Sequence, residues 1–222
     1  MGDLISLGAR RAARRSPLGG PAAPGARVSR VTFFFDLASP WTYLAAERVD
    51  RMFVDVRWRP ATGGTFAAAR AQPGQAELRA AAVRRAAELR MPLVWPEDWP
   101  AGSEVAMRVA SLAAEQGRAA AFVLAAGRLA FCGGFELDDP EVIAEAAAAA
   151  DLSLEDVLAA AGQKGRDIAM RRTSRGLLRR GADELPAILV DRRLFCGERR
   201  LTDALAAAAA TPLERRRRAR PT

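Results

Sequence analysis

Residues 31–36 begin the patterned part of the chain with a run of apolar, β-favouring residues, VTFFF, which ends at Asp36. A continuous apolar run of this length is typical of a strand buried on both faces. Ser39-Pro40 follows, and Ser is a preferred N-cap while Pro is preferred at the first helical position. We therefore predict a strand over 31–36 and a helix that begins at Ser39 and continues through Arg51.

The start of this helix is a candidate binding site. The first N–H groups of a helix have no partner within the helix, so those of Trp41 and Thr42 are expected to be free beside the Ser39 hydroxyl. Together with the helix dipole they favour a negatively charged ligand. The alternative, which the pattern leaves open, is that Ser39 is a helix cap and nothing more.

Three further strands follow from the pattern. Residues 54–59 alternate apolar and charged side chains up to Pro60, as in a half-buried strand. The segment 185–190 is a second apolar run, and 193–196 returns from a tight turn at 191–192 as its hairpin partner. Because a helix separates the first two strands, they are expected to be parallel. The prediction is a mixed sheet of strands 31–36, 54–59, 187–190 and 193–196.

Between the second and third strands the chain shows no strand signal. Helices are predicted over about 75–90, from a Ser103 cap to Gly117, over about 118–131, from Asp139-Pro140, from a Ser153 cap to Gly162, and over 166–180, with a last helix over about 200–209. The domain organisation expected is a thioredoxin-like unit of residues 31–64 and 182–210, a helical insertion over 65–181, a disordered basic segment over 1–30 and a basic tail over 211–222.

The net charge of +8 is concentrated at the two ends of the chain. Six arginines against Asp3 give residues 1–30 a charge of +5, and five against Glu214 give residues 211–222 a charge of +4, which leaves residues 31–210 at −1. A nearly neutral body argues against a basic groove that binds nucleic acid specifically. No apolar run reaches the length of about 18 residues that a membrane span needs.

The composition excludes several kinds of active site. The chain has no histidine, so a Ser-His-Asp triad, a Cys-His pair and a His-ligated metal are ruled out, and no metal site is predicted. Cys132 and Cys196 lie far apart with no Cys-x-x-Cys motif. Two buried thiols in a cytoplasmic protein are the favoured interpretation, with one structural disulfide as the alternative.

The order β-α-β, a helical block and β-β-α resembles the thioredoxin fold with a large helical insertion, as in DsbA-like proteins. Within that group the chain resembles the 2-hydroxychromene-2-carboxylate isomerase and kappa-class glutathione transferase branch. The matching pieces are FFFD at 33–36 with SPW at 39–41, RP at 59–60 with GG at 63–64, MP at 91–92, WP at 95–96, LP at 185–186 and FCG at 195–197.

The resemblance implies a site for glutathione or another low-molecular-weight thiol. Ser39 stands where related proteins carry their first redox cysteine, and its hydroxyl is expected to donate a hydrogen bond to the thiol sulfur. Thr42 stands at the other redox position, so dithiol exchange is excluded. Pro186 matches the family's cis-proline, and Leu185 before it is expected to pair with the backbone of the thiol ligand. The family's γ-glutamyl-binding pair aligns with Glu198-Arg199.

Two function classes remain open. The first is a thiol-dependent isomerase or transferase acting on a small aromatic or electrophilic substrate. The second is a DsbA-like binding or chaperone-like module without dithiol activity. A small-molecule partner is expected, with no membrane and no specific nucleic acid, and a homodimer is left open.

Overall fold

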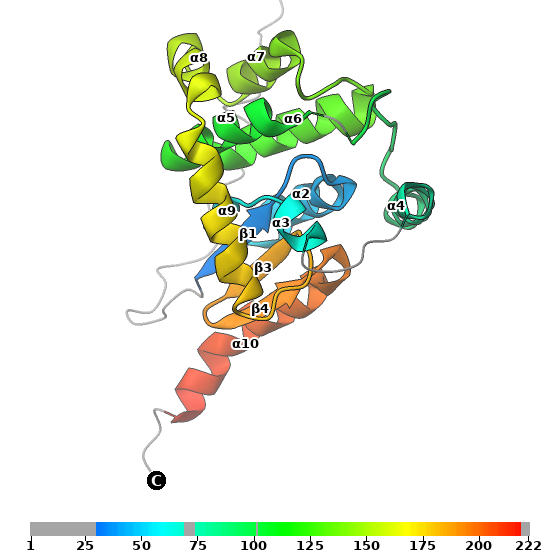
Figure 1. The fold of residues 1–222 in the computed structure, drawn as a ribbon. Helices are drawn as coiled ribbons and strands as arrows, with labels where there is room; N and C mark the ends of the chain where they lie inside the picture. The colour runs from blue at the N-terminus through cyan, green and yellow to red at the C-terminus, as the bar shows by residue number, and fades with distance from the viewer. Residues whose placement is uncertain (1–29, 69–73, 101, 219–222) are drawn as a thin grey trace, which may run out of the picture.

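The computed structural model describes residues 30–68, 74–100 and 102–218. The elements are β1 (Val31–Phe35), α2 (Pro40–Met52), β2 (Val56–Pro60), α3 (Gly64–Ala67), α4 (Gln75–Leu89), α5 (Glu104–Glu115), α6 (Ala119–Gly133), α7 (Pro140–Ala149), α8 (Leu154–Gly162), α9 (Gly165–Leu178), β3 (Ala187–Val190), β4 (Arg193–Cys196), the short 3₁₀ helix η1 (Glu198–Arg200) and α10 (Leu201–Arg218). Figure 1 shows the sheet in the middle of the molecule, with α5 to α8 gathered beyond one side of it.

The four strands form one mixed sheet, as predicted, and their order in it is β2-β1-β3-β4. β1 pairs parallel with β2 and antiparallel with β3, and β3 pairs antiparallel with β4. β2 begins two residues later than predicted, because Asp55 has a positive φ of 57° and Val54 is 81% exposed. Pro60 closes β2 instead of following it, which an edge strand tolerates.

Successive side chains of β1 enter two different clusters, as expected for a strand covered on both faces. Phe33 and Phe35 are fully buried in the large core, together with residues of α2, α5, α6 and α10. Phe34 points to the other face, into a smaller cluster that includes Phe66 of α3 and Leu177 of α9. The strand that leads to the Ser39 turn is therefore held by packing on both sides.

The helical block between β2 and β3 is confirmed, and no described residue within it pairs as a strand. The short helix α3 was not predicted, because the two glycines at its start, Gly63 and Gly64, favour a loop. The last helix extends to Arg218 instead of ending near 209, and its final turns are rich in Arg, a good helix former. The predictions for residues 1–29 and 219–222 lie outside the described residues. No helix in the described part of the chain has the length and hydrophobicity to span a membrane.

The N-caps of the helices between β2 and β3 differ in whether the side chain makes a cap hydrogen bond. Asp139 and Ser153 cap α7 and α8 with their side chains, which accept hydrogen bonds from Glu141 N and Asp156 N at 2.8 and 3.1 Å. Ser103 also precedes its helix, but its side chain makes no cap hydrogen bond. Its φ of −129° and ψ of 4° are far from the extended conformation of the other two caps, which explains the difference.

Candidate functional site

Ser39 occupies the N-cap position of α2, at the end of a four-residue turn that leaves β1. Its backbone is extended, with φ −92° and ψ 121°, as in a regular N-cap. Its N–H donates to the carbonyl of Asp36 at 3.1 Å, so the backbone of the turn is well bonded. Its hydroxyl, however, makes no cap hydrogen bond and has no partner among the described residues. The partly exposed hydroxyl is therefore available to a ligand.

The prediction that Thr42 offers a free N–H is wrong. Its N–H donates to the Ser39 carbonyl at 3.0 Å, and its hydroxyl accepts a hydrogen bond from Asp36 N at 3.2 Å. The residue is buried and serves to brace the turn. The N–H of Trp41 is free as predicted, with no partner in the described part of the chain. The Trp41 side chain is partly buried and packs against the core. At the start of α2, the Trp41 N–H and the Ser39 hydroxyl are therefore the two groups available to a ligand.

Asp36 ties this turn to the loop after β2. Its carboxylate accepts hydrogen bonds from Ala38 N at 3.0 Å and from Gly63 N. Burial raises the pKa of Asp36 above its ordinary value, while the two N–H donors act in the opposite direction. A Cβ on Gly63 would stand 3.0 Å from the Asp36 Oδ2 atom, so a larger residue at position 63 would press on this carboxylate.

Pro186 lies at the same end of the sheet as Ser39. Phe34 of β1 pairs with Ala187 of β3, and the two strands are antiparallel. One step further along β1, Phe35 is therefore next to Pro186, and the Ser39 turn begins directly after Phe35. The Leu185–Pro186 peptide is cis, as predicted. The Pro186 carbonyl accepts from Gly197 N at 2.8 Å, whereas the Leu185 backbone makes no hydrogen bond to another backbone group among the described residues.

The connector between α4 and α5 contacts the Ser39 turn directly. The Trp99 Nε1–H donates to the carbonyl of Ala38 at 2.8 Å. Trp95 packs against Trp99 with ring centroids 4.6 Å apart, and the Arg79 guanidinium lies over both rings at 5.1 and 5.3 Å. The aromatic connector therefore reaches from the helical insertion to the residue that precedes Ser39.

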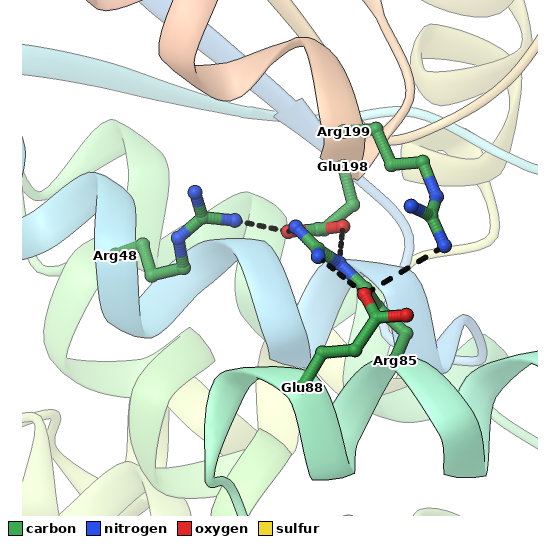
Figure 2. A network of polar contacts seen from close by, with 5 residues as sticks. All are labelled: Arg48, Arg85, Glu88, Glu198 and Arg199. Atoms are coloured by element: carbon green, nitrogen blue, oxygen red, sulfur yellow. Dashed lines mark hydrogen bonds and ion pairs between the residues drawn. The ribbon is translucent and has the colours of Figure 1, made fainter.

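Glu198, the first residue of the pair aligned with the family's γ-glutamyl-binding pair, is buried. Its side chain is 1% exposed and its carboxylate binds two arginines. Arg48 of α2 donates to one oxygen, and Arg85 of α4 binds both oxygens through Nε and a terminal nitrogen, at 2.7 and 3.0 Å (Figure 2). Burial lowers the pKa of Arg48, while the hydrogen bonds that Arg85 donates to Glu198 raise the pKa of Arg85. Glu198 therefore joins three elements of the fold.

Arg199, its neighbour in the sequence, is exposed. The side chain is 68% accessible and lies 3.9 Å from a carboxylate oxygen of Glu88, which itself hydrogen-bonds to Arg85 (Figure 2). An ion pair of this length in water is weak. Of the predicted pair at 198–199, one residue is a buried structural link and the other is accessible to a ligand.

The two cysteines are free thiols, so the disulfide alternative is wrong. Both are partly buried. Burial raises the pKa of Cys196, which keeps its thiol protonated and poorly reactive. Cys132 contacts the hydroxyl of Tyr43 at 3.1 Å. No group of three or more potential metal ligands occurs among the described residues.

Comparison with known proteins identifies the family of the chain. The sequence profile of the DSBA-like thioredoxin domain matches residues 30–209. The chain belongs to this family. No curated protein sequence matches it.

Among solved structures, a 2-hydroxychromene-2-carboxylate isomerase is similar with a TM-score of 0.73 and 17% identity, over 86% of this chain and 99% of that one. A probable DsbA oxidoreductase from Streptomyces coelicolor gives a TM-score of 0.61 and 23% identity, over 82% and 90%. The cytosolic disulfide reductase DsbM from Pseudomonas aeruginosa, solved with GSH, gives 0.57 and 21%, over 82% and 98%. At these identities the likeness is one of fold.

Several residues of this DSBA-like site escaped the sequence analysis. Asp36 was noted as the end of a strand, and the arginines that bind Glu198 lie within two of the predicted helices. Trp99 lies between two predicted helices, and no local pattern indicated its contact with Ala38. A buried acid flanked by apolar residues, as in FFFD, was the one local signal that could have indicated Asp36.

Proposed function

We propose that this protein is a thiol-dependent isomerase or transferase that acts on a small aromatic or otherwise electrophilic substrate. Glutathione or another low-molecular-weight thiol is its co-substrate, and the thiol sulfur binds at the start of α2 beside Ser39. The proposal places the reaction in the cytoplasm, where such thiols are kept reduced.

One observation carries the proposal: the Ser39 hydroxyl is unbonded although its backbone has cap geometry. The caps with comparable backbone angles, Asp139 and Ser153, both use their side chains. A serine needed for the helix alone would be expected to accept a hydrogen bond in the same way. The free hydroxyl is instead suited to donate to an external anion such as a thiolate.

The residues around Ser39 suit a thiolate. The N-terminus of α2 favours negative charge, and its first turn contains no acidic residue that would oppose it. Trp41 N–H and Ser39 Oγ–H are the donors that would stabilise the sulfur, and such donors lower the pKa of a thiol. Ser39 without a neighbouring base would be a poor nucleophile, so the nucleophile in this scheme is the bound thiolate.

The chemistry follows from that nucleophile. The sulfur adds to the β-carbon of a conjugated carbonyl compound, and the electron pair moves to the carbonyl oxygen as an enolate. Rotation about the new single bond follows. Return of the electron pair re-forms the double bond and expels the thiolate, so isomerisation consumes no thiol. In a transferase the enolate takes a proton from water and the sulfur stays attached.

Two solved structures support the choice of ligand and reaction class. The similar structure with the TM-score of 0.73 is an isomerase, and DsbM was solved with GSH. The aromatic connector with Trp95 and Trp99, which contacts Ala38, would suit an aromatic acceptor.

The test is a titration with glutathione and with other small thiols. Trp41 lies two residues after Ser39, so its fluorescence should respond, and Trp41→Phe identifies that signal. Ser39→Ala should weaken thiol binding about ten- to a hundredfold, as expected when a hydrogen bond to a charged group is lost. The pKa of the bound thiol, read from thiolate absorbance, should rise in this variant.

Ser153→Ala is the matched control, because it removes a serine cap far from the site and should bind like the wild type. Unchanged thiol binding and thiol pKa in Ser39→Ala would reduce Ser39 to a helix cap. That result would favour the alternative, a binding or chaperone-like module without dithiol activity.

A further inference from the structure

In the cluster around Glu198, both oxygens of the buried carboxylate are hydrogen-bonded by the protein itself. Glu198 accepts hydrogen bonds from Arg48 and Arg85, and its side chain is 1% exposed. Three elements contribute: α2 gives Arg48, α4 gives Arg85, and η1 gives Glu198 (Figure 2). A ligand ammonium group cannot reach this carboxylate.

Positive charge predominates in the cluster, since Arg51 acts on Arg48 and Arg84 acts on Glu88. In Figure 2 the guanidinium groups of Arg48, Arg85 and Arg199 lie around the carboxylates of Glu88 and Glu198. Arg199 is the most exposed of the three, with 68% of its side chain accessible and its nearest acid 3.9 Å away.

Glu88, the other acid drawn in Figure 2, is a poor site for an ammonium group. It hydrogen-bonds to Arg85 at 2.7 Å. That hydrogen bond, with the nearby positive charges of Arg199 and Arg84, holds the pKa of Glu88 below its usual range. A ligand ammonium placed against Glu88 would face these guanidinium groups, and like charges brought together oppose binding.

The cluster lies within reach of a ligand whose sulfur is at Ser39. Arg48 is nine residues after Ser39 on the same helix, which is about 14 Å along its axis. In glutathione the sulfur is on the central residue, so the far carboxylate reaches about two residue lengths from it, or about 7 Å, and an Arg side chain bridges the remainder. A second observation places Glu198 close to Pro186. The Gly197 N–H donates to the Pro186 carbonyl at 2.8 Å, and Gly197 immediately precedes Glu198.

We infer that this cluster binds the far end of the thiol co-substrate, and that it selects a thiol whose far end is a carboxylate without an adjacent ammonium group. The inference rests on the proposed function and makes it more specific. Arg199 supplies the exposed guanidinium, while the Glu198 links hold η1 and α4 in place around it. Glutathione, whose γ-glutamyl end carries both a carboxylate and an ammonium, is then a weaker ligand than its deaminated counterpart.

The test compares glutathione with glutaryl-cysteinylglycine, which differs from it by the missing ammonium group alone. Binding of both to the full-length protein is measured by titration calorimetry at low salt. The wild type should bind the deaminated thiol about fivefold or more tightly than glutathione. The preference should shrink as salt is added, because the charges concerned are accessible to solvent.

Arg199→Gln should remove this preference and leave the fold intact, since the side chain is exposed and makes one long ion pair. The matched control is Arg57→Gln, an exposed arginine on β2 at the opposite edge of the sheet, which should keep the preference. Circular dichroism checks that both variants fold.

The outcomes separate the two proposals. Equal affinities, tighter binding of glutathione, or a preference that survives Arg199→Gln would overturn the inference and leave the thiol-dependent function standing. Failure of both thiols to bind would overturn the inference, and failure of every small thiol in the titration described above would overturn the proposed function as well.

Discussion

The indole N–H of Trp99 donates a 2.8 Å hydrogen bond to the carbonyl of Ala38, the residue that precedes Ser39. The two residues are separated by 61 positions in the sequence. The bond is the direct polar link between the aromatic connector and the turn that carries the candidate site.

Replacing Trp99 by Phe should keep the buried ring and lose this bond. The Ala38 carbonyl would then lack its partner, which costs about 1–3 kcal/mol of unfolding free energy. Trp95→Phe is the matched control, because no hydrogen bond from the Trp95 indole occurs among the described residues. Urea unfolding followed by circular dichroism measures both, and an equal loss in the two variants would contradict the importance of the bond.

Ser39→Ala and Ser153→Ala should differ in stability. Ser153 caps α8 through a 3.1 Å hydrogen bond, so its loss should cost about 0.5–2 kcal/mol. Ser39 makes no such bond, and its replacement should cost no more than a few tenths of a kcal/mol, as for an ordinary surface change. Chemical denaturation provides the comparison. A larger loss for Ser39→Ala would show that its hydroxyl supports the fold.

Asp36→Asn should change how stability depends on pH. Burial raises the pKa of Asp36, so the folded protein holds this proton at pH values where the unfolded chain has lost it. The stability due to the protonated group is complete below the unfolded-state pKa and is lost as pH rises through the folded-state pKa.

The advantage of the wild type over Asp36→Asn should therefore decrease with rising pH from about pH 4, by at most about 1.4 kcal/mol per pH unit. Urea unfolding of both proteins at a series of pH values measures it. A difference that is constant with pH, or that grows, would contradict the predicted direction.

Gly63→Ala should destabilise the protein, while Gly64→Ala should not. A Cβ at Gly63 would stand 3.0 Å from Asp36 Oδ2, whereas at Gly64 no atom lies within 4 Å. Overpacking costs about 1–3 kcal/mol, and an Ala that fits a compatible backbone gains about 0.4–1 kcal/mol. The melting temperatures of the two variants should therefore move in opposite directions. A shift of the same sign in both would show that the Asp36 carboxylate adjusts freely.

The sequence by itself determined the strands, most of the helices and the start of α2. Those features follow from local patterns: a continuous apolar run gives β1, and Ser-Pro gives the helix start, because both depend on short-range sterics and on the burial of neighbouring residues. The parallel β1–β2 pair and the β3–β4 hairpin also followed from their connections, whereas the pairing of β1 with β3 came from the tertiary structure.

What each polar side chain does was decided by the tertiary structure. The sequence placed Glu198 in a candidate ligand-binding pair, but Arg48 and Arg85 come from two other helices and bind its carboxylate. Thr42 was expected to offer its N–H, but the turn folds so that Ser39 and Asp36 use both of its polar groups. Burial and pairing of charges depend on segments that meet only when the chain folds, and no local pattern records where their side chains will lie.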